Sequence, residues 1–301
     1  MHFHRYRPTA FLRVSGADAA SFLQGQFTNE LRRPVGAVVY GLWLDQKGKV
    51  LADSHVLRLG ENEFQIASTT SAATVIQARL EEYIVADEVV VTDETAPAHG
   101  LAVSGPQCGE ILRQILGSAP PRPGHFLQFT EMLIFAGRRT RGENYELIGS
   151  ERSITGIARQ LPMLGGREIA AAEMEFIRIQ EGIPSIPNDL GPGDLPHEGG
   201  LEDAALSYTK GCYLGQEVMA RLKNLGQVRR RLHVIRGPGV PPAVSAPLYQ
   251  DETRVGQVRS VAVRGDGFVA LALLSLVNLA PAAGLSLAPE AAPTIRIMPH
   301  G

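Results

Sequence analysis

The chain has 301 residues, 44% of them hydrophobic and 20% charged, which is typical of a globular protein of about two domains. Its 29 Lys and Arg against 31 Asp and Glu give a formal net charge of −2, so general nucleic-acid binding, which needs a strongly basic field, is excluded. Cys108 and Cys212 are the only cysteines, and two are too few for a disulfide framework or a four-cysteine metal site; with no secretory leader or membrane-spanning stretch, we expect a cytoplasmic protein.

The first third of the chain predicts an α+β unit. A strand at 11–14 is followed by a helix at 17–31, where apolar residues recur at helical spacing. The next predicted elements, in order, are strands at 38–44, 50–59 and 64–67, a helix at 71–83 and a strand at 88–92. Residues of about 38–93 therefore form a β-β-β-α-β subdomain inserted in an α+β subdomain. Its first turn, Asp45–Lys49, predicts a tight hairpin with Gly48 at positive φ.

A similar order of elements recurs more loosely, which favours an α+β fold over a doubly wound sheet. The predicted elements are a strand at 101–104, a helix at 106–116, strands at 126–129, 132–136 and 145–148, and a helix at 151–161. A proline- and glycine-rich break at 236–242 marks the predicted domain boundary. We assign residues 1–235 to one region and 242–301 to a small C-terminal β-barrel, with strands at 247–249, 254–263 and 268–274.

The helix that ends at Gly182 carries apolar residues on two opposite sides, which predicts burial on both. Glu181 continues one of these apolar stripes and lies in the last turn, where the helix dipole disfavours a negative charge. Such a conflict is expected where a side chain binds a polar ligand. Two alternatives remain open: the last turn frays and places Glu181 in water, or Arg178 pairs with it. The Pro- and Gly-rich segment 183–196 that follows predicts a long, ordered loop that wraps something.

The segment Lys210–Arg221 contains the more reactive of the two cysteines. Cys212 is expected near a helix N-terminus, where the dipole and Lys210 would lower the pKa of its thiol. The alternative is that Cys212 is a small buried apolar residue without a reactive role. Cys108 has a similar local position, but no cation is near it in the sequence. Residues 221–231 carry five positive charges and no acid, so they form either a solvated face or, with Lys47 and Lys49, a site for a polyanionic tail or phosphate.

Several of these segments together resemble one protein family. Lys-Gly-Cys-Tyr-Leu-Gly-Gln-Glu at 210–217, followed by Arg221, is similar to the signature of the YgfZ-type folate-binding proteins, relatives of the glycine-cleavage aminomethyltransferase that support iron-sulfur enzymes. The resemblance continues in Phe-Leu-Gln-Gly-Gln-Phe-Thr-Asn at 22–29, in the 45–49 turn, in Glu-Gly-Ile-Pro at 181–184 and in Val-Gly-Gln-Val-Arg-Ser at 255–260.

The resemblance implies an aminomethyltransferase-like fold, with three subdomains in a ring around a channel that holds tetrahydrofolate or a derivative. Glu181 would contact the pterin, and Cys212 and Lys210 would act as the reactive pair at the channel edge. Further residues expected to bind the folate are Phe176, Arg178, Tyr213, Gln216, Glu217 and Arg221. No tightly bound metal is expected in the isolated chain, because one thiol cannot hold a cluster without ligands from a partner.

One departure from the family pattern bears on activity. The aminomethyltransferases use an aspartate near the start of the helix after the third strand, and residues 66–74 contain no acid. We therefore favour an accessory factor for assembly or repair of iron-sulfur enzymes, which binds those enzymes or cluster-assembly proteins transiently. The alternatives are a tetrahydrofolate-dependent aminomethyl or one-carbon transferase and a non-catalytic folate-responsive scaffold.

Overall fold

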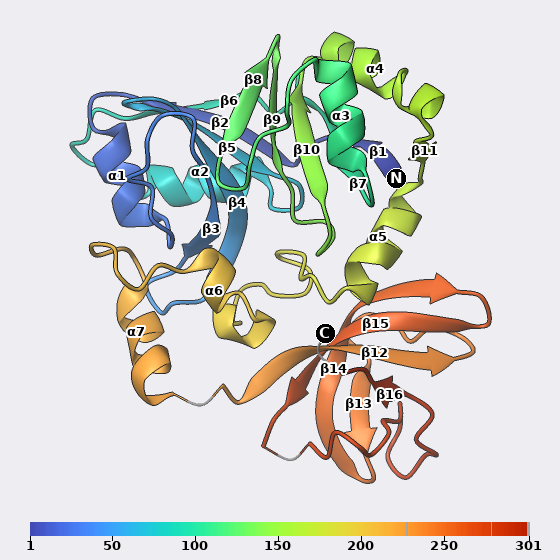
Figure 1. Ribbon diagram of the computed structural model, residues 1–301. Helices are drawn as coiled ribbons and strands as arrows, with labels where there is room; N and C mark the ends of the chain where they lie inside the picture. Colours follow the sequence, from blue (N-terminus) through green and yellow to red (C-terminus); the bar gives the residue numbers. More distant parts are fainter. Residues whose placement is uncertain (227, 278, 300–301) are drawn as a thin grey trace.

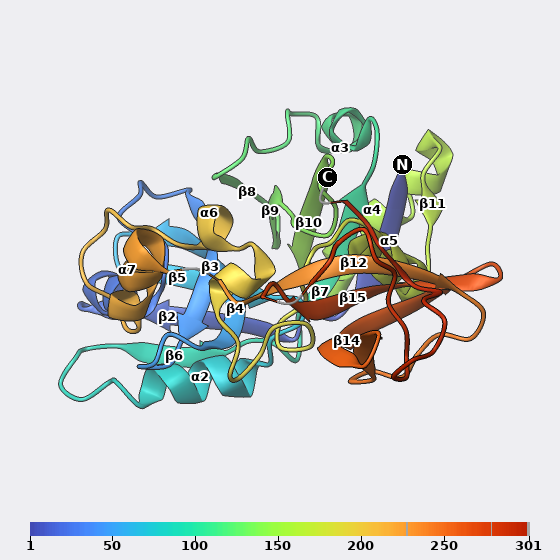
Figure 2. The same ribbon diagram turned by 90° about the horizontal axis from the view of Figure 1, so that it is seen from below.

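The computed structural model describes residues 1–226, 228–277 and 279–299, without the side chains of Leu225 and Arg264. Three β-sheets surround the centre of the molecule, and most helices lie on their outer sides (Figures 1 and 2). The helices are α1 (Ala19–Gln26), α2 (Ala73–Glu81), α3 (Cys108–Leu116), α4 (Glu151–Ala158), α5 (Ala171–Gln180), α6 (Glu202–Ala205) and α7 (Gln216–Leu225), with 3₁₀ turns η1 (Leu161–Leu164) and η2 (Pro196–Gly199).

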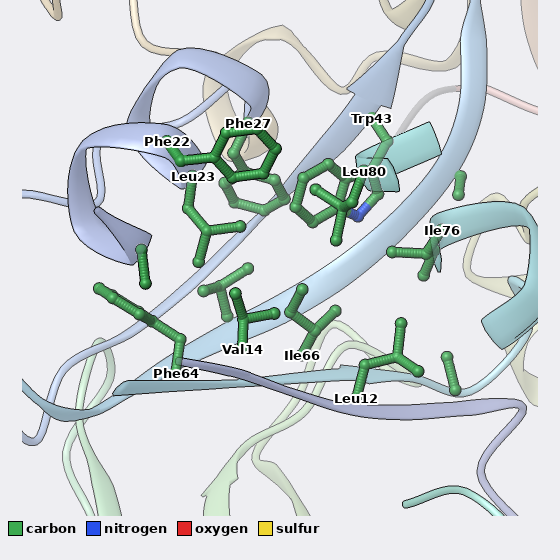
Figure 3. Packing of buried hydrophobic residues seen from close by; sticks show 14 of the residues in the cluster. Leu12, Val14, Phe22, Leu23, Phe27, Trp43, Phe64, Ile66, Ile76 and Leu80 are labelled. Carbon is green, nitrogen blue, oxygen red and sulfur yellow. The ribbon is translucent and has the colours of Figure 1, made fainter. Parts of the chain in front are cut away.

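The first sheet is antiparallel and has the order β3-β4-β5-β2-β6. Its strands are β2 (Ala10–Ser15), β3 (Val38–Leu44), β4 (Val50–Gly60), β5 (Glu63–Ser68) and β6 (Val90–Asp93). Leu23 of α1 and Ile76 of α2 pack with Val14 and Ile66 in one buried cluster (Figure 3), so both helices cover the same face. The predicted elements of this region are confirmed, and Gly48 has a φ of +72° in the predicted turn.

Helix α1 is shorter than predicted, because it ends at Gln26 rather than at residue 31. The next residue, Phe27, is extended and forms a β-bridge with Trp43. Thr28 then donates its hydroxyl to the carbonyl of Ala205 at 2.7 Å and accepts the N–H of Leu42 at 2.8 Å. These tertiary bonds replace the helical ones that the apolar spacing predicted.

The second sheet has the order β11-β1-β7-β10-β9-β8. Its strands are β1 (His2–Tyr6), β7 (His99–Ser104), β8 (Phe126–Phe129), β9 (Met132–Ala136), β10 (Asn144–Gly149) and β11 (Arg167–Glu168). Helices α3 and α4 pack on one face in a single buried cluster that includes Cys108. Burial raises the pKa of the Cys108 thiol to about 12, so this cysteine is an inert core residue. Strand β1, which the polar N-terminal sequence did not predict, pairs with β7 in the middle of the sheet.

The C-terminal sheet is antiparallel with the order β13-β14-β15-β12-β16. Its strands are β12 (Arg230–Pro238), β13 (Pro247–Gln250), β14 (Thr253–Arg264), β15 (Gly267–Ser275) and β16 (Arg296–Ile297). Single bridges from Tyr249 to Ser286 and from Leu285 to Ile295 link its two edges, which makes a small barrel. Strand β12 pairs with β15 along its whole length, so this sheet begins at residue 230 and not after the glycine- and proline-rich break at 236–242.

Helix α5 is buried on two sides, as predicted. Met174 packs with Ala102 of the second sheet, whereas Ile179 packs with Leu271 of the C-terminal sheet. The helix is therefore the joint between these two sheets, visible in yellow-green in Figure 1. A helix with one apolar stripe can bury only one face. The second apolar stripe of α5 is therefore the sequence feature that predicts its contact with a second sheet.

The loop after α5 wraps another part of the same chain. Ile186 and Leu190 are buried against Leu44 and Val50 of the β3–β4 hairpin. The carbonyl of Asp194 accepts the N–H of Val50 at 3.0 Å, and its carboxylate accepts hydrogen bonds from Arg230 and Arg259 of the C-terminal sheet at 3.2 and 3.1 Å. The loop thereby fixes the first sheet relative to the barrel.

Candidate functional site

Two large cavities lie between the three sheets. One of about 790 Å³ is bordered by residues 136–145 of the second sheet, by 182–184 after α5 and by the start of β12. The other, of about 610 Å³, is bordered by parts of the first and second sheets and shares Ala136 and Arg138 with the larger one. Both volumes lie in the range that small-molecule sites occupy. The centre of the ring is therefore the candidate site.

The β9–β10 hairpin, residues 137–143, supplies three arginines to this centre. The Arg139 guanidinium is paired, because its Nε donates to Glu146 Oε1 at 2.6 Å. The Nε of Arg141 donates to the carbonyl of Glu181 at 2.9 Å. Arg138 borders both large cavities and a third, internal one, and its guanidinium lies 3.9 Å from the Tyr40 ring centroid. Its guanidinium also hydrogen-bonds the Tyr40 hydroxyl, and its charge lowers the pKa of Asp53 against the effect of burial. Arg138 therefore presents a positive charge to the cavities from a position beside Tyr40 and Asp53.

Glu181 directly precedes residues that line the larger cavity. It is half-buried at the C-cap of α5, and its carboxylate accepts the backbone N–H of Arg141. The next three residues, 182–184, line the cavity wall. The alternative in which Arg178 pairs with Glu181 is wrong, because Arg178 bonds Asp189 at 2.7 Å and Glu175 at 2.8 Å. The hairpin thus holds the Glu181 carboxylate next to Arg141, which lines the cavity.

A buried carboxylate that the sequence analysis missed lies beside this site. Asp53 of β4 accepts hydrogen bonds from the hydroxyls of Ser71 at 2.7 Å, Tyr40 at 2.9 Å and Ser68 at 3.3 Å. It lines an internal cavity of about 90 Å³ that Arg138 also borders. Burial raises the pKa of Asp53 above its ordinary value, although these hydrogen bonds oppose the shift. Ser68 and Ser71 belong to the segment that lacks the family's aspartate, so that segment contacts a carboxylate from a different strand.

His55 lies two residues further along the same face of β4. Its ring centroid is 5.2 Å from that of Tyr40 and 4.9 Å from that of Phe135. Burial and the charges of Arg138 and Arg139 lower the pKa of His55 to about 3, so the imidazole is neutral at pH 7. The period-two spacing of Asp53 and His55 within an otherwise apolar strand was the available sequence signal for both residues.

The signature segment lies elsewhere, at the outer edge of the first sheet. Lys210 is buried, and its ammonium donates to the carbonyls of Gln24, Phe27 and Asn29 at 2.7, 2.7 and 2.9 Å. These bonds satisfy carbonyls at and just after the C-terminal end of α1. Burial lowers the pKa of Lys210 to about 8. The ammonium that was expected to act on the Cys212 thiol is thus hydrogen-bonded to backbone carbonyls at and after the end of α1.

Cys212 is exposed. Helix α7 begins at Gln216, so the prediction that Cys212 lies at a helix N-terminus is wrong by four residues. The intervening Gly215 has a φ of +83°, and a Cβ there would lie 2.9 Å from the carbonyl oxygen of Asp45. The chain uses these residues to pack the loop against the 45–49 turn instead of starting the helix earlier.

Three segments that the resemblance rests on therefore meet in one place. The N–H of Leu214 bonds the carbonyl of Gly25 at 3.2 Å, and a Cβ on Gly48 would lie 2.8 Å from the terminal methyl of Met219. We call the residues 22–29, 45–49 and 210–219 the signature cluster. None of the described residues between 207 and 229 lines the three central cavities. The structure does not bring Cys212 and Glu181 together in one cavity.

The other predicted folate contacts also lie away from the central cavities, except for Arg178. Tyr213 is buried in the signature cluster, and its N–H bonds Gln216 at 3.3 Å. Glu217 and Arg221 form an exposed pair at 3.0 Å. Phe176 is half-buried against the C-terminal sheet and lines a separate groove. Arg178 borders the small internal cavity but is engaged in its buried ion pair.

The basic segment 221–231 is largely neutralised by acids of the same chain. Arg230 bonds Glu198 at 2.8 Å, and Arg231 lies 3.6 Å from Glu202. Within the described residues, no three His, Cys, Asp or Glu side chains are grouped as a metal site would require. No described helix combines the length and the hydropathy that crossing a bilayer would need.

The comparisons with known proteins identify the fold and the family of this chain. Residues 8–207 match the GCVT N-terminal domain, which defines the class of protein. The aminomethyltransferase T of the glycine cleavage system from Bartonella henselae has the same fold, with a TM-score of 0.78 over 94% of this chain and 81% of that one, at 20% identity. The expected α+β, aminomethyltransferase-like architecture is confirmed.

Curated relatives narrow the class. The mitochondrial iron-sulfur cluster assembly factor IBA57 of Mus musculus is 32% identical over 88% of this chain and 75% of its own length. The tRNA-modifying protein YgfZ of Edwardsiella ictaluri is 32% identical over 75% of this chain and 68% of its own length. The chain belongs to the YgfZ-type family, which is related to the glycine-cleavage aminomethyltransferase.

Proposed function

We propose that this protein is a folate-binding accessory factor for the assembly or repair of iron-sulfur enzymes. The observation that carries the proposal is the cavity of about 790 Å³ between the second sheet, the segment after α5 and the start of β12, with the Glu181 carboxylate bonded to the backbone of Arg141, which lines it. The names of two relatives, an iron-sulfur cluster assembly factor and a tRNA-modifying protein, support a role of this kind.

The residues at the ring centre fit tetrahydrofolate or a derivative. A reduced pterin presents N–H and NH₂ donors, which suit the Glu181 carboxylate as acceptor. The guanidinium of Arg138, which borders both large cavities, suits the carboxylates of the folate glutamate. Bound tetrahydrofolate supplies nitrogens that carry one-carbon groups, whereas the chain supplies binding, orientation and exclusion of water. We assign the folate to the larger cavity, which Arg138 borders and which Glu181 adjoins through Arg141.

Cys212 has a different part in this proposal. Its thiol is exposed, so a partner protein can reach it while folate occupies the ring centre. One thiol cannot hold a cluster, so a role as a shared ligand requires further ligands from a partner enzyme or cluster-assembly protein. A thiolate or redox role for Cys212 requires the same transient contact.

Calorimetric titration with tetrahydrofolate tests the folate assignment. We expect Glu181→Gln and Glu181→Ala to weaken binding by about tenfold or more, because one charge-assisted acceptor is lost. Glu61→Gln, an exposed carboxylate outside the cavities, is the matched control and should bind as the wild type does. Absence of binding to the wild type would overturn the folate assignment.

Complementation tests the accessory role. In cells that lack the native protein, we expect the wild type to restore iron-sulfur enzyme activity and Cys212→Ser to fail. Full rescue by Cys212→Ser would remove the thiol from the mechanism. Combined with weakened folate binding by Glu181→Gln, that result would identify the non-catalytic folate-responsive scaffold instead.

Asp53 favours a second candidate function, a tetrahydrofolate-dependent aminomethyl or one-carbon transferase. Its buried carboxylate adjoins the ring centre, where an acid stabilises a developing positive charge on a ligand. Incubation with methylenetetrahydrofolate and candidate amines, followed by product analysis, tests this. Enzyme-like turnover that Asp53→Asn abolishes would replace the accessory role with the transferase.

A further inference from the structure

A second binding groove lies on the C-terminal barrel, outside the central cavities. It has a volume of about 440 Å³ and lies where the cover of α5 ends over the ends of β12 and β15. Phe176 and Val269 form its apolar wall, and Arg236 and Arg296 form its polar side. Gly237 and Gly267 also line it. No acidic residue is among the described residues that line it.

The two arginines are held side by side by the sheet. Arg236 of β12 and Arg296 of β16 are direct cross-strand partners, so their side chains leave the same face of the barrel at neighbouring positions. Val269 is the partner of Arg236 on the other side and packs against α5. The alternate residues Ile235 and Ile297 point into the barrel core. The pairing fixes both guanidiniums on the groove side.

This pairing carries an electrostatic cost. Like charges directly opposite each other in a sheet destabilise it. In the parts of the chain that the structure describes, neither guanidinium has a hydrogen bond or ion pair, and both side chains are exposed. A carboxylate placed between them would remove the repulsion and accept bidentate hydrogen bonds.

We propose that this groove binds a small organic acid with an apolar body, with the carboxylate between Arg236 and Arg296 and the apolar part against Phe176 and Val269. The apolar wall distinguishes this ligand from inorganic phosphate or a sugar phosphate, which would leave the wall exposed to water. The volume of the groove lies within the range of small-molecule sites. The proposal is independent of folate binding at the ring centre.

The experiment uses 4-phenylbutyrate as the probe and 4-phenylbutanamide as its uncharged counterpart. Arginine Nε–H resonances of the full-length protein are followed by NMR during titration with each compound. We expect 4-phenylbutyrate to give saturable shifts at Arg236 and Arg296, and the amide to bind about tenfold more weakly or worse. Equal binding of acid and amide, or no saturable shift with the acid, would overturn the proposal.

Variants separate this site from general charge effects. Arg236→Gln combined with Arg296→Gln should abolish binding of the acid, whereas Arg254→Gln, an exposed arginine on β14 outside the groove, should leave it unchanged. The double variant should keep or raise the melting temperature, because the repulsion is removed, which shows that it folds. Retained acid binding in the double variant would refute the assignment. Tetrahydrofolate affinity should not change.

Discussion

The signature cluster and the β9–β10 hairpin use their positive charges in opposite ways. Lys210 in the cluster is buried, and its ammonium is saturated by three backbone carbonyls. Arg138 in the hairpin borders three cavities, and its guanidinium contacts the Tyr40 side chain and acts on the Asp53 carboxylate. The first arrangement fixes a loop in place, whereas the second places a positive charge at the border of the cavities.

The most distinctive sequence motif and the candidate ligand site are therefore different parts of this molecule. The octapeptide at 210–217 is the most distinctive part of the sequence, yet its lysine, its tyrosine and Gly215 all serve packing against α1 and the 45–49 turn. Of that segment, only Cys212 presents a reactive group to solvent. We interpret the segment 210–217 as a loop whose buried residues hold the exposed Cys212 thiol in a fixed position.

The largest change in stability is expected on substitution of Arg178, whose charge, like that of Lys210, is used within the fold. Its guanidinium joins α5 to Asp189 of the long loop at 2.7 Å and to Ser260 of the barrel at 3.2 Å. Arg178→Met leaves the fully buried Asp189 carboxylate without its cation, which should lower the free energy of unfolding by about 3 to 5 kcal/mol. Urea denaturation measures this. A loss of folate affinity with unchanged stability would instead make Arg178 a ligand residue.

Lys210 should show the next largest effect. Lys210→Met keeps the aliphatic stem but leaves three carbonyls without their donor, so the free energy of unfolding should fall by about 2 to 4 kcal/mol. Lys47→Met, at an exposed position in the 45–49 turn, is the matched control and should change it by less than about 0.5 kcal/mol. Comparable stability of both variants in urea denaturation would contradict the stabilising role of the Lys210 hydrogen bonds.

Arg138 should show the reverse pattern, with a change in binding and little change in stability. Arg138→Gln should weaken tetrahydrofolate binding about tenfold, because a charge-assisted hydrogen bond is lost. Its unfolding free energy should change by no more than about 1 kcal/mol, the value of the contact with Tyr40. Arg152→Gln, an exposed arginine on α4, controls for net charge in the same calorimetric titration. Equal affinities of the two variants would remove Arg138 from the ligand site.

The smallest change is expected for His55, where it is a change in the free energy of unfolding per pH unit. Its pKa is lowered from 6.5 to about 3 in the folded state, so the unfolded chain binds more protons between those values. Stability from this group is therefore complete above about pH 6.5 and lost on acidification, by up to about 1.4 kcal/mol per pH unit. His55→Phe should flatten this dependence in urea denaturation between pH 4 and 6. An unchanged slope would show that His55 does not remain neutral in the fold.

Most of the secondary structure could be predicted from local sequence patterns. The first and second sheets have the predicted strands because alternation and β-branched residues mark half-buried strands in any context. Strands β1 and β12 were missed since their sequences are rich in arginine and histidine, and only their neighbours in the sheets make them strands. The end of α1 was misplaced because the bonds that stop it come from residues 42 and 205.

The candidate site was less predictable than the fold. Glu181 was identified because its position conflicts with its own helix; it directly precedes residues 182–184, which line the larger cavity, and its contact with a ligand stays a prediction. Asp53, His55 and the arginines of the 137–143 hairpin were missed. Apart from the period-two spacing of Asp53 and His55, nothing in the local sequence marks them, and they become a site only where separate sheets face one another.

The sequence by itself determined the α+β class, the two-sided burial of α5 and the resemblance to one family, because periodicity and short motifs are local properties of the chain. The tertiary structure alone decided which charges are free. Whether Lys210, Arg178 or Arg138 can bind a ligand depends on which carbonyls and carboxylates reach it from residues up to 186 positions away. That balance is set by how the three sheets close into a ring.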